Sequence, residues 1–185
     1  ILKVSLPPSA PSDASETCDI ANSVDNSGLY IVPAFTGLGA PHWDMESKGL
    51  ITGISRDTNK SHFVRAALES ISYQVNDLYK AIKLDMNTGF SLLKVDGGAT
   101  ANDFLMQFQS DILNLEINRP KNIETTSLGA ALLAGLSSEF WKDPKDFQNI
   151  IETDRTFKPN IDSRKRKSLL SGWDEAIHKT ISKRR

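Results

Sequence analysis

The sequence predicts an α/β domain in which a mostly parallel sheet is covered by helices. From Gly49 onward the apolar residues are spaced for a strand, a helix, a strand, a helix, a strand and a helix in turn, followed by one more helix. This alternation is typical of parallel sheets whose strands are joined by crossover helices. The length of 185 residues corresponds to one domain, or to one domain with a tail.

The composition argues against several classes of protein. The 22 Lys and Arg residues against 23 Asp and Glu residues leave a net charge of −1, whereas a nucleic-acid binder needs surplus positive charge. A membrane span needs ~20 apolar residues, and the apolar runs here are much shorter, so we expect none. The single cysteine, Cys18, cannot build a disulfide framework or a cysteine zinc cluster within one chain. It indicates a reducing compartment, so we expect a cytoplasmic protein.

Residues 1–27 are predicted to be a partial linker or insert. The sequence opens on Ile1 without a methionine or a signal peptide, which indicates a chain entered part-way through a longer protein. Residues 5–16 hold three prolines and four serines, a composition typical of flexible or extended segments. The folded part is therefore expected to begin near Gly28.

Two short strands and a loop are predicted next. Residues 29–32 form a β-branched apolar run that ends at Pro33, which indicates a buried strand. Residues 34–44 are rich in glycine and proline and predict a loop. Residues 49–55 predict a second strand, in which Gly53 marks a bulge or a close backbone approach.

Four helices and two further strands complete the prediction. A long helix is capped by Asn59 or Ser61 and stopped at 87–89, and its apolar residues predict one buried face: Val64, Leu68, Ile71, Val75, Leu78 and Ile82. Strands are predicted at 92–95 and 116–119. The helix between them starts at about 100–102 and should bury four residues: Leu105, Phe108, Ile112 and Leu115. A small-residue helix at 126–137 could lie close against a sheet, and a last helix at about 163–182 should bury Leu170, Trp173, Ile177 and Ile181.

The turn after the strand at 92–95 is the best candidate for a binding site. Gly97 and Gly98 remove two side chains where a strand passes into a helix, so a ligand can approach the backbone, and a positive φ is expected at Gly98. Three kinds of polar group near this turn could bind a nucleotide: the free N–H groups of the following helix, the amide of Asn102 and the carboxylate of Asp96. The motif is neither G-x-G-x-x-G nor a Walker loop, and a purely structural tight turn is the alternative.

Other polar groups give weaker signals. His42, Asp44 and His62 match no familiar metal spacing, which favours surface or hydrogen-bonded histidines and predicts no metal site. The basic runs at 164–167 and 183–185 are typical of solvated surface. No residue is an evident general base or nucleophile, so no catalytic residue is predicted.

Several segments resemble the FGGY carbohydrate kinases. Gly-Leu-Ile-Thr-Gly-Ile at 49–54, followed after seven residues by His-Phe-Val-Arg-Ala-Ala-Leu-Glu at 62–69, is similar to the second signature of that family. Within the family, residues 32–44, 95–113 and 125–136 resemble the glycerol kinases. Pentulose kinases usually carry a charged loop in place of residues 36–41. The resemblance extends over about residues 27–181, which is most of the chain.

The resemblance implies a ribonuclease H-like (actin-like ATPase) fold, with a mixed sheet flanked by helices. Residues 28–185 would be the C-terminal FGGY kinase domain, incomplete at its N-terminal side. Nucleotide contacts would come from Gly97, Gly98, Ala99 and Asn102, and residues 127–136 would back the adenine.

The implied function is the nucleotide-binding part of a glycerol kinase, which transfers the γ-phosphate of ATP to glycerol. The catalytic aspartate, the glycerol site and the Mg²⁺ site would lie outside this chain, so the chain alone should be inactive, and the full enzyme would be a homo-oligomer. The alternative is a non-catalytic nucleotide-binding or interaction module.

Overall fold

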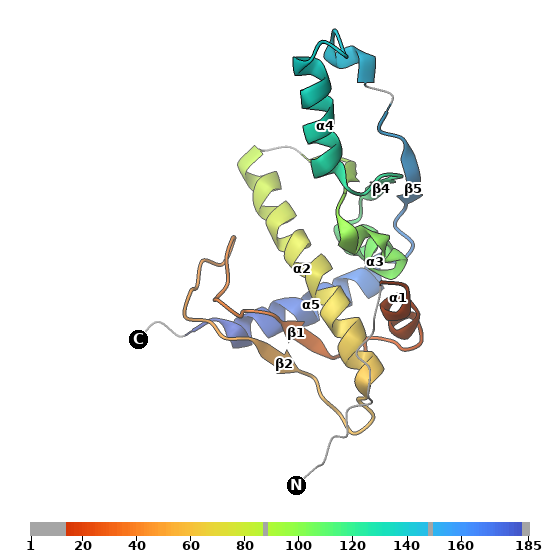
Figure 1. Ribbon diagram of the computed structural model, residues 1–185. Helices are drawn as coiled ribbons and strands as arrows, with labels where there is room; N and C mark the ends of the chain where they lie inside the picture. Colours follow the sequence, from red (N-terminus) through yellow and green to blue (C-terminus); the bar gives the residue numbers. More distant parts are fainter. Residues whose placement is uncertain (1–13, 87–88, 148–149, 183–185) are drawn as a thin grey trace.

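The computed structural model describes residues 14–86, 89–147 and 150–182 (Figure 1). Among these residues no helix is both long enough and apolar enough to cross a membrane. The elements, in chain order, are α1 (Ala14–Asn22), β1 (Tyr30–Val32), β2 (Leu50–Thr52), α2 (Lys60–Met86), β3 (Leu92–Lys94), the 3₁₀ helix η1 (Gly98–Ala101), α3 (Asp103–Leu113), β4 (Glu116–Pro120), α4 (Thr125–Ser137), the 3₁₀ helix η2 (Pro144–Phe147), β5 (Thr153–Phe157) and α5 (Ser163–Thr180).

The strands form two separate sheets. β1 and β2 pair antiparallel, with Ile31 opposite Ile51, and β1 packs against α2 and α5. In the second sheet, β3 pairs parallel with β4, and β4 pairs antiparallel with β5. The mostly parallel sheet predicted from the alternation is therefore wrong, because β3–β4 is the one parallel pair among the described residues. The mixed sheet flanked by helices is confirmed.

β5 has no counterpart among the predicted strands. Its sequence, Thr-Asp-Arg-Thr-Phe, is polar, and four of its five residues are exposed. Backbone pairing with β4 holds this strand, and Phe157 is its single buried side chain, 1% exposed. A strand with so little apolar content lacks the alternation from which strands are recognised in sequence.

The main core is an aromatic cluster between α2, α3, α5 and β1. The Tyr73 ring stacks on Trp173 with centroids 5.1 Å apart and meets the edge of Phe108 at 5.5 Å. Trp173 is fully buried, and its indole Nε1 donates a 2.7 Å hydrogen bond to Asp77 Oδ2. Such ring pairs contribute ~0.5–1.5 kcal/mol each beyond the apolar area that they bury.

α2 does not bury the face that its apolar spacing predicts. Ile71 is 40% exposed and Leu78 is 45% exposed. The helix instead buries a largely polar set: His62, Ala66, Glu69, Ser70, Ser72, Tyr73, Asn76 and Asp77. Most charged members of this set have partners from other elements, and a paired polar group can be buried without the desolvation penalty of an unpaired one.

The other predicted helix faces agree better with the structure. Leu105, Phe108, Ile112 and Leu115 are all at most 7% exposed. In α5, Trp173 and Ile177 are buried, but Ile181, which follows the helix, is 37% exposed. α4 buries no residue and projects away from the other helices, so it does not lie against a sheet as predicted (Figure 1).

Ordered structure begins before Gly28. α1 lies within the segment predicted to be a linker or insert, and it packs on α2 and α3 with Ala21 fully buried. Arg65 of α2 donates to the carbonyl oxygens of Ala21, at 3.1 Å, and Val24. Residues 5–13 of the proline-rich segment, residues 87–88 of the predicted helix stop and the basic run at 183–185 lie outside the described residues.

Candidate functional site

The turn after β3 is held by backbone hydrogen bonds. Gly97 has φ 86° and ψ 163°, a conformation that is essentially restricted to glycine. Its N–H donates to the carbonyl of Ile123 at 2.8 Å, and its carbonyl accepts from the N–H and the hydroxyl of Thr100 at 3.0 and 2.7 Å. The positive φ predicted at Gly98 belongs to Gly97 instead. Gly97 therefore sets the direction in which the chain enters η1.

Gly98 and Ala99 form the open face of this turn. Both residues are exposed and begin η1. A Cβ atom built on Gly97 or Gly98 would meet no atom within 4 Å, so the space in front of the turn is free in this chain. A planar or anionic group can approach the backbone here without displacing protein atoms.

Asn102 has a structural role in this chain. Its side chain is buried, 3% exposed, and caps α3 by accepting the N–H of Leu105 on Oδ1 at 2.9 Å. Its Nδ2 donates to the hydroxyl of Thr17 in α1 at 3.0 Å. The residue predicted to contact a nucleotide thus joins the turn, α3 and α1, while Gly98 and Ala99 face outward beside it.

Arg119 of β4 supports the turn, although no sequence pattern points to this residue. Its Nη1 donates to the carbonyl of Thr100 at 2.8 Å and to Asp103 Oδ1 at 2.7 Å, while Nε and Nη2 bind Asp154. Burial alone would lower the pKa of Arg119, but the hydrogen bonds to Asp154 and Asp103 outweigh it and raise the pKa. No spacing in the sequence shows that these carboxylates, 16 and 35 residues away, meet one arginine.

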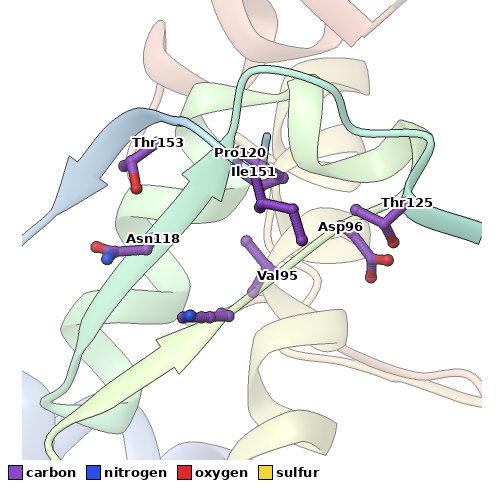
Figure 2. Close-up of a pocket in the computed structure, with 8 residues that line it drawn as sticks. Val95, Asp96, Asn118, Pro120, Thr125, Ile151 and Thr153 are labelled. Carbon is purple, nitrogen blue, oxygen red and sulfur yellow. The ribbon is translucent and has the colours of Figure 1, made fainter. Parts of the chain in front are cut away.

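A cavity of about 400 Å³ lies at the carboxyl ends of β3 and β4, next to the turn (Figure 2). Its lining consists of Lys94, Val95, Asp96, Asn118, Pro120, Thr125, Ile151 and Thr153. Asp96 belongs both to this lining and to the turn, but the four predicted nucleotide residues do not line the cavity. Residues 127–136 do not line it either, and α4 reaches it through Thr125 alone.

His42, Asp44 and His62 each have a partner of their own in the structure. His42 Nε2 is 3.3 Å from Asp77 Oδ2, and His62 Nδ1 is 3.0 Å from Asn59 Oδ1. The hydroxyl of Ser182 binds Asp44 and is the main reason that its pKa is lowered to about 2. Among residues 14–86, 89–147 and 150–182, no three His, Cys, Asp or Glu side chains are grouped to hold a metal ion.

The segment that resembles the family signature carries a buried ion pair. Arg65 Nε donates to Glu69 Oε1 at 2.7 Å, and Glu69 is 1% exposed. Asn26 Nδ2 donates to Glu69 Oε2 at 2.6 Å. Burial raises the pKa of Glu69, and the hydrogen bonds and charge of Arg65 oppose that rise. These residues tie α2 to the segment that follows α1, far from the turn at 97–102 in sequence.

Comparison with known proteins decides the family. Residues 7–138 match the model of the FGGY family of carbohydrate kinases, C-terminal domain. The chain belongs to the FGGY family of carbohydrate kinases. The match begins at residue 7, inside the stretch predicted to be a linker or insert, in agreement with the position of α1.

Relatives of known sequence are named glycerol kinase. One, from Mycoplasmopsis pulmonis, is 52% identical over 158 residues, which are 85% of this chain and 31% of the relative. Glycerol kinase 2 of Thermotoga maritima is 48% identical over 171 residues, 92% of this chain and 34% of the relative. The chain therefore spans about a third of the length of these relatives.

Solved structures confirm the FGGY kinase fold, which is actin-like. The crystal structure of Plasmodium falciparum glycerol kinase with ADP matches with a TM-score of 0.82 and 38% identity, over 93% of this chain and 35% of that one. Gluconate kinase from Lactobacillus acidophilus matches with a TM-score of 0.69 over 91% of this chain and 34% of that one. Its 24% identity supports the shared fold alone.

Proposed function

We propose that this chain is the nucleotide-binding part of a glycerol kinase, an enzyme that transfers the γ-phosphate of ATP to glycerol and forms glycerol 3-phosphate. The observation that carries the proposal is the close similarity to glycerol kinases: 46–52% identity in sequence, and a TM-score of 0.82 to one crystallised with ADP. Structures of gluconate and xylulose kinases are at most 24% identical to this chain. Glycerol is therefore the favoured acceptor among the substrates of the family.

The proposed nucleotide contact is the turn formed by Gly97, Gly98, Ala99 and Asn102. Gly98 and Ala99 would meet the nucleotide directly, because they are exposed and Gly98 has open space before it. Gly97 would direct the turn through its glycine-only conformation, and Asn102 would hold it as the cap of α3. The absence of a side chain at Gly98 leaves the room that a bound adenosine group needs close to the backbone.

The catalytic aspartate, the glycerol site and the Mg²⁺ site are proposed to lie outside this chain. Phosphoryl transfer depends mainly on positioning and on charge stabilisation, so a part that only orients ATP can still be essential for the reaction. The described residues hold no group suited to a metal ion, and we assign no step of the reaction to a metal bound by them. A cytoplasmic location and a homo-oligomeric enzyme are part of the same proposal.

A phosphorylation assay tests this division of roles. The purified chain, given ATP, Mg²⁺ and glycerol, should form no glycerol 3-phosphate above the level of a mock preparation. The protein expressed from the whole gene that carries this chain should form it, and should prefer glycerol to xylulose and gluconate. Turnover by the chain alone would refute the division of roles, and a preference for another sugar would refute the substrate. A whole protein that binds ATP without phosphorylating any of the three would favour the non-catalytic module.

A further inference from the structure

A second, larger cavity lies at the opposite end of the parallel strand pair. It has a volume of about 630 Å³, and its walls come from α2, from residues 89–91 before β3, from residues 113–115 before β4, and from α5. Because β3 and β4 run parallel, this cavity lies at their amino ends, whereas the turn at Gly97 and the cavity beside it lie at their carboxyl ends. The volume is within the range of about 300–1,000 Å³ that is usual for small-molecule sites.

Three cationic side chains line this cavity, and its described lining contains no carboxylate. Lys80, Lys83 and Arg166 supply the positive charges. Lys80 has only long contacts with Asp77, at 3.7 Å, and Asp174, at 4.0 Å, and Lys83 forms no ion pair among the described residues. The lining is therefore positively charged and favours an anion.

One of these side chains is held in place by a hydrogen bond to the backbone. Arg166 Nε donates to the carbonyl of Ile112 at 2.8 Å, so its guanidinium is fixed at the end of α3. Lys83 is exposed, and its stem lies beside Gly89. Cations that are already positioned lose less conformational freedom when an anion binds.

A buried amide without a partner lies in the same wall. Asn76 is 1% exposed and lines the cavity, and its Nδ2 has no hydrogen-bond partner among the described residues. A buried donor that is left unpaired is costly, and such groups are rare in folded proteins. A ligand oxygen that reached this donor would satisfy it, which an apolar ligand could not do.

An aromatic pair forms an apolar part of the wall. Tyr79 and Phe90 meet edge to face with centroids 4.8 Å apart, and both line the cavity. If a ligand combined a phosphate group with a carbon skeleton, the cations could bind the phosphate and the aromatic rings could pack against the carbon skeleton. A phosphomonoester carries nearly two negative charges at neutral pH, which suits three cations better than a single carboxylate does.

We propose that the cavity formed by Asn76, Tyr79, Lys80, Lys83, Phe90 and Arg166 binds a small phosphomonoester. The phosphate oxygens accept hydrogen bonds from Lys83, Arg166 and the Asn76 amide, and the carbon skeleton packs on the Tyr79–Phe90 pair. This site is separate from the proposed nucleotide turn, and it does not depend on the function proposed for that turn.

The test is a titration of the ¹⁵N-labelled chain with inorganic phosphate and with phenyl phosphate, followed by NMR at constant ionic strength. Constant ionic strength is needed because general screening also shifts the resonances of charged surfaces. We expect saturable shifts of the amides at 89–91 and 113–115. Phenyl phosphate should bind about tenfold tighter than inorganic phosphate, because its ring gains the aromatic contact. Equal affinity would refute the assignment of the carbon skeleton to the aromatic wall.

Three variants make the test specific. Lys83→Gln removes an exposed charge without touching the core, and Asn76→Leu removes the unpaired donor while keeping the branching and the number of non-hydrogen atoms of the side chain. Each should weaken phosphate binding at least about fivefold. Lys142→Gln, which removes an exposed lysine near η2, should leave the affinity unchanged.

Two results would overturn the proposal. One is that Lys83→Gln binds phosphate as tightly as the parent chain. The other is that the shifts do not saturate, or that they centre on residues 97–102. Shifts at 97–102 would support the nucleotide turn while refuting this second site.

Discussion

Gly97 and Gly98 are neighbours in sequence, but their substitutions should have opposite effects. Gly97 adopts φ 86° and ψ 163°, which costs any other residue about 1–3 kcal/mol. Gly98 has no positive φ, and a Cβ atom there would meet nothing within 4 Å. Replacing a glycine by alanine in a compatible conformation stabilises a protein by about 0.4–1 kcal/mol, because the unfolded chain loses freedom. We therefore expect Gly97→Ala to destabilise the fold and Gly98→Ala to leave it intact or slightly more stable.

The melting temperature gives the first measurement. For a chain of this size, 1 kcal/mol corresponds to about 2–4 °C, so Gly97→Ala should lower the melting temperature by about 2–12 °C. Urea unfolding of the same variants gives the free energy of unfolding directly. If Gly97→Ala is as stable as Gly98→Ala, the argument from backbone strain is wrong.

Nucleotide affinity gives the second measurement. Gly98→Val places a branched side chain where we propose that ATP meets the backbone, and it should weaken ATP or ADP binding by at least about tenfold. Titration calorimetry on the protein expressed from the whole gene measures this loss, with glycerol affinity as the internal control. A Gly98→Val protein that is folded and binds ADP like the parent would refute the assignment of the nucleotide to this turn.

Three further predictions follow from individual contacts. Asn102→Ala should lose about 0.5–2 kcal/mol of stability with the cap of α3, whereas Asn102→Asp should keep most of it. Gly172→Ala should cost about 1–3 kcal/mol, because its Cβ would lie 2.3 Å from the Tyr30 hydroxyl oxygen, while Gly129→Ala in exposed α4 should gain about 0.5–1 kcal/mol. The lowered pKa of Asp44 makes it stabilising above about pH 4, and that stability should be lost as the pH falls towards 2. Asp44→Asn should remove this acid dependence.

Each of these expectations has a contradicting result. Equal urea midpoints for Asn102→Ala and Asn102→Asp would show that the cap contributes nothing. A Gly172→Ala chain as stable as Gly129→Ala would mean that the neighbouring ring moves away freely. Acid unfolding of Asp44→Asn and of the parent chain can be measured by circular dichroism. Parallel unfolding curves would show that the contact with Ser182 does not contribute to stability.

Local features of the fold were predictable from the sequence. Leu105, Phe108 and Ile112 follow the helical period of α3, and the structure buries all three, together with Leu115 just after the helix. Gly97-Gly98 marked a turn between a strand and a helix, because paired glycines interrupt both kinds of regular structure. These features depend on a few consecutive residues, so neighbouring residues in the sequence suffice to predict them.

The buried face of α2 was not predictable in the same way. Its apolar spacing favours one face, but the helix turns Glu69 and Asp77 inward because distant groups satisfy them. Asn26, 43 residues before Glu69, and Trp173, 96 residues after Asp77, supply hydrogen bonds that no periodicity encodes. The cost of burying a charge depends on partners that only the folded chain brings together.

In the candidate site, too, some features were predictable from the sequence and others were not. The sequence alone determined where the turn lies, that glycine is needed there, and that the chain resembles the FGGY kinases. Only the tertiary structure decided that Gly97 rather than Gly98 carries the positive φ, that Asn102 donates to Thr17 of α1, and that Arg119 holds the carbonyl of Thr100. The physical reason is distance along the chain. Backbone preferences and helix caps act between residues close in sequence, whereas ion pairs and cavities form between residues that meet only after the strands and helices have packed.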